Sequence, residues 1–265
     1  MTKEHAWPRW LGQGEQVEPT QTTRTIGFGR TADDAMTEVP NRVVTKPGSV
    51  LTARVREVCA DCNNGWMSRL EEAVMPLLGR LWQLSYPFGV ATLSAGEATI
   101  VATWAAKTAW VRERVTEPDS TPTAEMREEL MVRRMPPDFT SAWIARHQGQ
   151  SNFGVYLARI EVNHQEDHWG TSRRRHVLIC TMTFRGLSLL IRTDDGWGVP
   201  PMRLPAQKWQ ALWPASGSSM QWPPDSPVSD SDVHAAAAYH AGWLRMPEVP
   251  VFNRDPNGWE KIRRN

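Results

Sequence analysis

Residues 58–71 read VCADCNNGWMSRLE and hold two of the chain's three cysteines, Cys59 and Cys62. Two thiolates three positions apart can bind one metal ion from a single tight turn, at about 2.3 Å for zinc. The same spacing also occurs in redox-active thiol pairs. That alternative requires a strand–helix–strand setting, which the flanking sequence does not show, so the spacing favours a metal site.

The flanks of this turn predict a strand before it and a helix after it. Residues 49–58 alternate enough for a strand. Ser68 and Glu71 have the spacing of a capping box at a helix start. Asn63 lies at the junction, as a candidate metal ligand and also a candidate N-cap. Apolar residues then recur at helical steps of three and four: Trp66, Leu70, Val74, Leu77 and Leu81.

Composition limits the class of protein. The chain has 265 residues, of which 40% are hydrophobic, and 14 tryptophans, which is enough for a sizeable core. Its formal net charge of +1 gives no overall attraction to nucleic acid. Neither a run of 18 apolar residues nor an apolar signal-peptide core is evident. Three cysteines do not make a disulfide framework. We therefore expect a cytoplasmic protein without a membrane partner.

The amino end carries a second motif, EHAWP at residues 4–8. Together with VCADCN at residues 58–63, it resembles the two halves of an HNH endonuclease. In that family an acidic residue and a histidine precede a proline on the first arm of a ββα-metal unit. More narrowly, the chain is similar to a bacterial and phage subgroup with the pattern EH-x-x-P-x-W and C-x-x-CNNGWMS-x-LE. The segments LWP at 212–214 and QWPP at 221–224 match the C-terminal half of that subgroup.

The resemblance implies a metal-dependent nuclease that cuts DNA, connected with phage or other mobile elements. His5 is then the general base that activates water, because neutral imidazole is available near pH 7. Glu4 and Asn63 offer hard oxygen ligands for a catalytic Mg²⁺ or Mn²⁺. Cys59 and Cys62 are the soft ligands of a structural Zn²⁺.

Charge adds little to the expected DNA contact. Residues 1–80 contain ten Lys or Arg and ten Asp or Glu residues, so the predicted nuclease module is neutral. Arg54, Arg56 and Arg69 are candidate nucleic-acid contacts by their clustering alone.

Departures from the family pattern leave an alternative open. The full pattern has a second CxxC before the Glu-His pair, whereas only three residues precede Glu4 here. A structural zinc site takes four ligands, so either the true start lies upstream of Met1, or the site is lost or takes other ligands. The middle Asn of the family is not evident, since Arg54 and Val55 stand near the corresponding place. The alternative is a catalytically inactive, HNH-derived nucleic-acid-binding or interaction protein.

The whole chain predicts an α+β fold in two parts, an HNH-like ββα-metal module at residues 1–84 and an α+β domain at residues 85–265. Residues 15–48 read as loop and irregular hairpin. The second part begins with a helical pair. Ser94 and Glu97 form a capping box for a helix to about residue 115, and Thr121-Pro122 starts the next helix, which ends before Pro136.

An antiparallel β-meander follows, and then a C-terminal helix. The expected strands are residues 140–146, 154–162, 176–184 and 187–193. Residues 194–228 read as ordered irregular chain rich in Trp and Pro. Asp230 or Ser231 caps an Ala-rich helix that Gly242 ends.

Other polar and sulfur-containing residues have ordinary interpretations. His164 and His168 lie four apart with acids between them, but a polar loop without helical periodicity favours a solvated segment over a metal pair. Residues 173–175 are three arginines and read as a solvated cluster, with phosphate contact as the alternative. Cys180 lies in an apolar strand and reads as a buried structural thiol.

Overall fold

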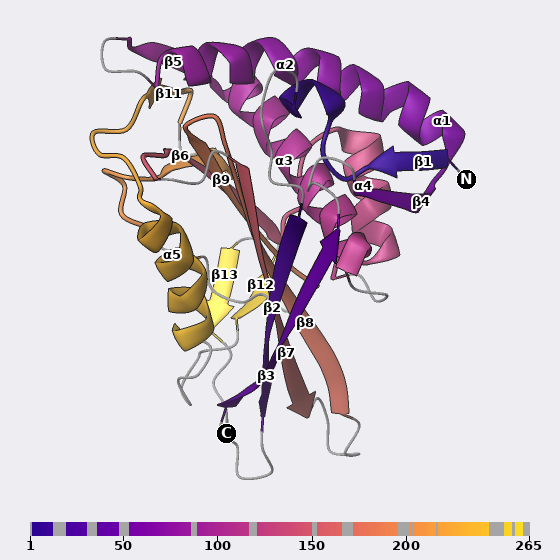
Figure 1. Ribbon diagram of the computed structural model, residues 1–265. Helices are drawn as coiled ribbons and strands as arrows, with labels where there is room; N and C mark the ends of the chain where they lie inside the picture. The colour runs from indigo at the N-terminus through magenta and orange to yellow at the C-terminus, as the bar shows by residue number, and fades with distance from the viewer. Residues whose placement is uncertain are drawn as a thin grey trace.

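The fold is α+β, as predicted: helices pack on antiparallel sheets (Figure 1). The protein is represented by a computed structural model. It describes residues 2–12, 20–30, 36–47, 53–85, 89–116, 121–149, 153–165, 172–195, 202, 204–215, 217–243, 252–255 and 258–261.

The amino end forms a two-stranded antiparallel sheet of β1 (Thr2–His5) and β4 (Arg54–Val58). The backbone N–H of Ala6 extends the pairing by donating to the carbonyl of Ala53 at 2.8 Å. A short 3-10 helix η1 (Arg9–Gly12) follows β1. Because Trp7 and Leu11 are fully buried, this end is packed rather than frayed.

Residues 15–48 were expected to be loop and irregular hairpin, and in the segments that the structure describes a hairpin is present, longer and more regular than expected. Two long strands, β2 (Thr20–Arg30) and β3 (Met36–Pro47), pair along nearly their whole length with one irregularity near Thr25. β-Branched residues such as Val43 and Val44 favour the extended backbone. The hairpin lies beside β7, so neighbouring chain supports it (Figure 1).

The helix after the cysteines begins earlier than expected. It consists of α1 (Ala60–Cys62), a π-helical turn η3 (Asn63–Met67) and α2 (Ser68–Gln83). The predicted Ser68–Glu71 capping box is wrong, because Ser68 is already inside the helical run. Its hydroxyl instead donates to Glu72 at 3.4 Å. The predicted apolar stripe does face the core: Val74 and Leu81 are buried, and Trp66, Leu70 and Leu77 pack against the core while half-buried. Leu78, which was not predicted, is buried as well.

The expected helical pair is present as α3 (Ala95–Thr116) and α4 (Ala124–Arg133). The capping box before α3 is confirmed: Glu97 N–H donates to Ser94 Oγ at 3.2 Å, and Ser94 N–H donates to Glu97 Oε2 at 2.8 Å. The second helix starts later than predicted, because Thr123 is its N-cap and accepts the N–H of Met126.

A five-stranded antiparallel sheet occupies the middle of the chain. Its strands are β6 (Thr140–Arg146), β7 (Phe153–Gln165), β8 (Ser172–Phe184), β9 (Leu187–Asp194) and β10 (Gln210–Trp213). The order is β10-β6-β9-β8-β7. β7, β8 and β9 form a meander as predicted, but β6 pairs with β9 and not with β7. The four strands therefore form a Greek key rather than a simple meander.

The segment predicted to be irregular, residues 194–228, contains two short strands where the structure describes it. β10 extends the large sheet, and β11 (Ser219–Trp222) pairs with β5 (Ala91–Ser94). The final helix α5 (Asp230–Trp243) runs past Gly242. Its start is stabilised by Ser229, one residue before the predicted caps, through reciprocal bonds with Asp232. The last strands are β12 (Phe252–Asp255) and β13 (Gly258–Lys261).

The core crosses the predicted boundary between residues 84 and 85. Trp7 and Trp104 both contact the ring of Phe184 edge-on, with centroids 5.7 and 6.0 Å apart. Trp222 Nε1 donates to the carbonyl of Leu81 at 2.9 Å. The two parts therefore share one hydrophobic core, and a division into two independent domains stays a prediction. In the part of the chain that the structure covers, no helix has the length and apolar character needed to cross a membrane.

Candidate functional site

The two cysteines predicted as zinc ligands lie on one turn, where β4 passes into the helix. Cys59 is the N-cap of α1, with extended backbone (φ −71°, ψ 154°), and its Sγ accepts the N–H of Cys62 at 3.0 Å. Cys59 is exposed and Cys62 is half-buried, and both are free thiols. The interpretation of Asn63 as N-cap is wrong, because Cys59 has that role and Asn63 closes α1.

The two thiols have opposite pKa shifts. The pKa of Cys59 is lowered, first by the hydrogen bond from the Cys62 thiol and then by the Cys62 backbone N–H. The pKa of Cys62 is raised, first by that same thiol contact and then by desolvation. A negative charge in this pair therefore resides on the sulfur of Cys59, which is the more exposed of the two. The thiolate is the form of cysteine that binds metals and attacks electrophiles.

The predicted catalytic histidine lies at the end of β1. His5 is half-buried and pairs with Arg54, whereas Thr2 pairs with Val58, the residue directly before Cys59. Arg54, the partner of His5, is therefore four residues before Val58, or about 13 Å along β4. His5 is separated by about this distance from the end of β4 at which the helix begins. The backbone of Glu4 belongs to β1, and its side chain is outside the part of the chain that the structure describes.

A metal cluster is not assembled by the described residues. Among them, no group of three or more His, Cys, Asp or Glu side chains could hold a metal ion. Cys59 and Cys62 fit half of a tetrahedral zinc site, and no third ligand from these residue types joins them within the described ranges. A cation shared by Glu4, His5 and Asn63 stays a prediction.

The other predicted contacts are scattered or outside the described side chains. Arg54 and Arg69 are exposed, and the side chain of Arg56 is outside the described part. The same holds for the side chains of His164 and the three arginines at 173–175, whose backbones pair in β7 and β8. His168 lies outside the residues that the structure describes. Cys180 is confirmed as buried, and desolvation raises its pKa to about 12.

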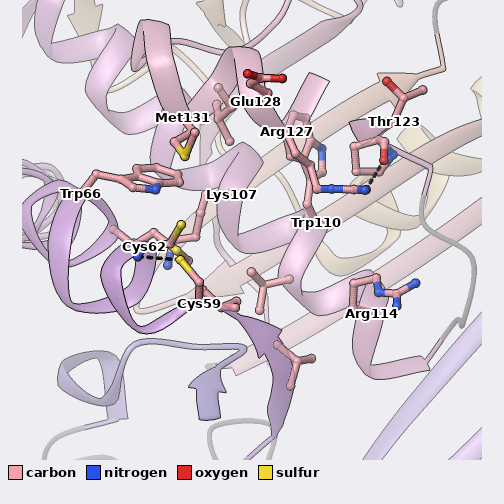
Figure 2. A pocket seen from close by; sticks show the side chains of 16 residues that line it. Cys59, Cys62, Trp66, Lys107, Trp110, Arg114, Thr123, Arg127, Glu128 and Met131 are labelled. Atoms are coloured by element: carbon pink, nitrogen blue, oxygen red, sulfur yellow. Dashed lines mark hydrogen bonds between the residues drawn. The ribbon is translucent and has the colours of Figure 1, made fainter. Parts of the chain in front are cut away.

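A cleft that the sequence did not predict opens beside the cysteine turn (Figure 2). Its volume is about 740 Å³. One wall is β4 and the cysteine turn, and the others are α3 and α4 with the chain that leads into α4. Figure 2 shows Cys59, Cys62 and Trp66 on one side and Arg114 and Arg127 on the other. The remaining lining residues include Val55, Val58, Lys107, Trp110, Val111, Thr123, Glu128, Leu130 and Met131.

Helical spacing explains how these side chains meet. Lys107, Trp110, Val111 and Arg114 recur at steps of three and four, and so lie on one face of α3. Charged residues on this face of an otherwise apolar helix were the signal that sequence reasoning missed. Lys107 is almost fully buried, with 4% of its side chain exposed, and it donates to Glu71 of α2 at 2.7 Å.

Trp66 reaches the cleft from the π-helical turn. Gly65 beside it has non-helical backbone (φ −98°, ψ −105°), which kinks the helix at this point. The guanidinium carbon of Arg134 lies over the indole ring of Trp66, 4.7 Å from its centroid. Such a cation–π contact holds the ring in place. Burial lowers the pKa of Arg134, and the nearby positive charge of Arg69 acts in the same direction.

Comparison of the chain with protein-family models, with curated proteins and with solved structures finds no match.

Proposed function

We propose that the protein is a metal-dependent endonuclease that hydrolyses phosphodiester bonds in DNA. The observation that supports this most directly is the order of elements at the amino end. The strand with Glu4 and His5 pairs with β4, and β4 leads directly into the helix that carries Cys59, Cys62 and Asn63. This is the strand–strand–helix order that the resemblance implies for an HNH nuclease.

His5 has the chemistry that the reaction needs. A neutral imidazole can take a proton from water as the water attacks phosphorus. A bound Mg²⁺ or Mn²⁺ would offset negative charge on the transferred phosphoryl group. Glu4 and Asn63 are the oxygen ligands suited to such an ion.

A plasmid-nicking assay with Mg²⁺ or Mn²⁺ tests the activity. We expect the wild-type protein to nick supercoiled DNA, EDTA to stop it, and His5→Ala to lower the rate by about 100-fold or more. The matched control is His234→Ala, because His234 is an exposed histidine on α5, remote in sequence from the cysteine turn. DNA left intact by the wild type, or equal rates for wild type and His5→Ala, would contradict the proposal.

Zinc content tests the role of the cysteine turn separately. If Cys59 and Cys62 hold a structural zinc ion with further ligands, the purified protein contains zinc, and Cys59→Ser or Cys62→Ser removes it. Cys180→Ala is the control, because Cys180 is buried away from the turn. Elemental analysis of the three variants checks this, and zinc retained in Cys59→Ser would exclude a thiolate site.

A second function is favoured by one observation. The cleft beside the cysteine turn combines cationic and aromatic side chains. Such a cleft fits a catalytically inactive protein that binds nucleic acid. DNA binding that persists in EDTA, together with no cleavage under any divalent cation, would favour this function over the nuclease.

A further inference from the structure

Two arginines from different helices lie beside Trp66. Arg134 is the C-cap of α4, and its guanidinium carbon lies 4.7 Å from the centroid of the Trp66 ring. Arg69 follows Trp66 by three positions in the helical run, a spacing that puts two side chains on the same face of a helix. Figure 2 shows that Met131, one turn before Arg134, also lies beside this ring. The start of α2 and the end of α4 therefore bring two guanidinium groups to one aromatic side chain.

Neither arginine has an acidic partner in the part of the chain that the structure describes. Glu72, three positions after Arg69, accepts the hydroxyl of Ser68 at 3.4 Å and forms no ion pair with Arg69. Other cations of α2, α3 and α4 do pair with carboxylates: Arg80 with Glu97, Arg133 with Glu129, and Lys107 with Glu71. Arg69 and Arg134 thus differ from these cations, because no described carboxylate balances them.

The two unbalanced charges repel each other. The pKa of Arg134 is lowered, first by desolvation and next by the positive charge of Arg69, and only the Cys62 thiol acts in the opposite direction. A guanidinium has five N–H donors in one plane, and contact of its face with an indole leaves the donors at its edges available. An anion at these two groups would relieve the repulsion and accept from those donors.

The backbone of Arg134 fixes the place of its side chain. Its φ of 56° and ψ of 32° lie in the left-handed region, which glycine or asparagine usually occupies at the end of a helix. Its N–H donates to the carbonyl of Leu130 at 3.1 Å, and its carbonyl accepts the hydroxyl of Thr103 at 3.2 Å. The ring beneath is held as well, because the Trp66 N–H donates to the thiol of Cys62. Little conformational freedom is therefore lost when Arg134 binds an anion.

We propose that Arg69 and Arg134 together bind a backbone phosphate of a nucleic acid. Guanidinium groups match phosphate oxygens in geometry and charge. Both side chains are exposed, so the site is open to a long polymer. This inference rests on the proposed action on nucleic acid, and it adds a contact of α4 to the expected contact of Arg69. Such a contact positions the strand without reading its sequence, and it does not supply the catalytic base.

Fluorescence anisotropy with a labelled twenty-base-pair DNA duplex, in EDTA and over a series of salt concentrations, tests the proposal on the full chain. We expect Arg69→Gln and Arg134→Gln each to weaken binding by about 10-fold, as for loss of one hydrogen bond to a charged group. The slope of log affinity against log salt should become shallower by about 1 in Arg134→Gln. These losses should be the same for duplexes of different sequence, because a phosphate carries no sequence information.

Two further variants separate binding from folding and from general charge. Arg134→Gly should lose as much affinity as Arg134→Gln and still melt close to wild type, because glycine adopts the left-handed backbone without strain. Arg133→Gln is the matched control, since it removes the neighbouring arginine, which pairs with Glu129, and its affinity should stay close to wild type. Circular dichroism and melting curves show whether each variant is folded.

The outcomes distinguish this site from the nuclease activity. Losses in the Arg69 and Arg134 variants, but not in Arg133→Gln, support the site even if no DNA is cleaved. Wild-type affinity in the folded Arg69→Gln and Arg134→Gly proteins overturns it, even if His5-dependent cleavage is observed. Calorimetry with inorganic phosphate distinguishes a free ion from the backbone. Phosphate binding that Arg134→Gln abolishes, with DNA affinity unchanged, would also overturn the proposal, as would a wild-type protein that does not bind DNA.

Discussion

The backbone N–H of Cys62 donates a hydrogen bond to the thiol sulfur of Cys59 across 3.0 Å. This bond caps the helix and places both sulfur atoms on the same turn. The hydrogen bond from the Cys62 thiol, and after it this backbone N–H, lowers the pKa of Cys59, while the same thiol contact and then desolvation raise the pKa of Cys62. The pair is therefore asymmetric even before a metal or an oxidant is present.

Thiol labelling should show this asymmetry in the metal-free protein. Cys59 should react first with iodoacetamide, and because its pKa is lowered, its reaction should continue to lower pH than that of an ordinary thiol. Cys180 should react only after denaturation, since it is buried and its pKa is raised to about 12. Peptide mass spectrometry of a pH series measures the three rates. Faster labelling of Cys62 than of Cys59 would contradict the hydrogen-bond arrangement.

Capping of α3 gives a prediction about stability. Ser94→Ala removes the acceptor for the Glu97 N–H and should lower the free energy of unfolding by about 1 kcal/mol. Glu97→Gln should cost less, because an amide oxygen still accepts the Ser94 N–H. Urea denaturation of both variants measures the two losses, and a larger loss for Glu97→Gln would indicate that charge, through Arg80, matters more than the cap.

Local patterns predicted the strands and helices of the second part well, and the reason is visible in the sheet. Residues of β8 alternate between two cores: Leu178 and Cys180 face α2 and α3, while Val177 and Ile179 face α5. Both faces are buried over residues 177–184, which explains why this part of the strand is apolar except for Thr181 and Thr183. The tight turn at Arg185 and Gly186, with φ of 46° and 76°, closes the β8–β9 hairpin.

Long-range features could not be derived in the same way. The pairing of β6 with β9 depends on contacts between residues 41 to 53 positions apart in sequence, and nothing within β6 itself specifies its neighbour. The cleft has the same origin, because Trp66 and Arg127 come to line one cavity only through the arrangement of elements distant in sequence. The predicted start of the helix after β4 differs from the observed start for a local reason. The N-cap of α1 is Cys59, and cysteine is not among the residues that commonly cap helices.

The shared core predicts how the chain unfolds. Leu78 of α2 is fully buried in the core that also contains Trp104 and Phe184. Leu78→Ala should therefore destabilise residues 1–84 and the large sheet together, by about 2–5 kcal/mol. Met75→Ala is the control on the same helix, because Met75 is 41% exposed, and it should change stability by about 0.5 kcal/mol or less. Two separate calorimetric transitions, with only one moved by Leu78→Ala, would show that the parts fold independently.

His147 predicts a loss of stability in mild acid. Its side chain is 2% exposed and its Nε2 lies 3.0 Å from Asp230 Oδ1. Burial lowers its pKa, and the attraction of Asp230 only partly opposes this. The unfolded chain therefore binds a proton below about pH 6.5, where the folded protein still has neutral His147. The stability is complete above that pH and is lost as the pH falls toward the lower pKa of the folded state.

Melting temperatures between pH 7.5 and pH 5 measure this effect. His147→Gln keeps a neutral polar side chain beside Asp230, so its melting temperature should fall less steeply with acid than that of the wild type. His234→Gln, at an exposed position of α5, should keep the wild-type slope. If the His147→Gln and wild-type profiles run parallel over this range, then the imidazole is not held neutral by burial, and the acid sensitivity has to come from carboxylates that lose their partners as they protonate.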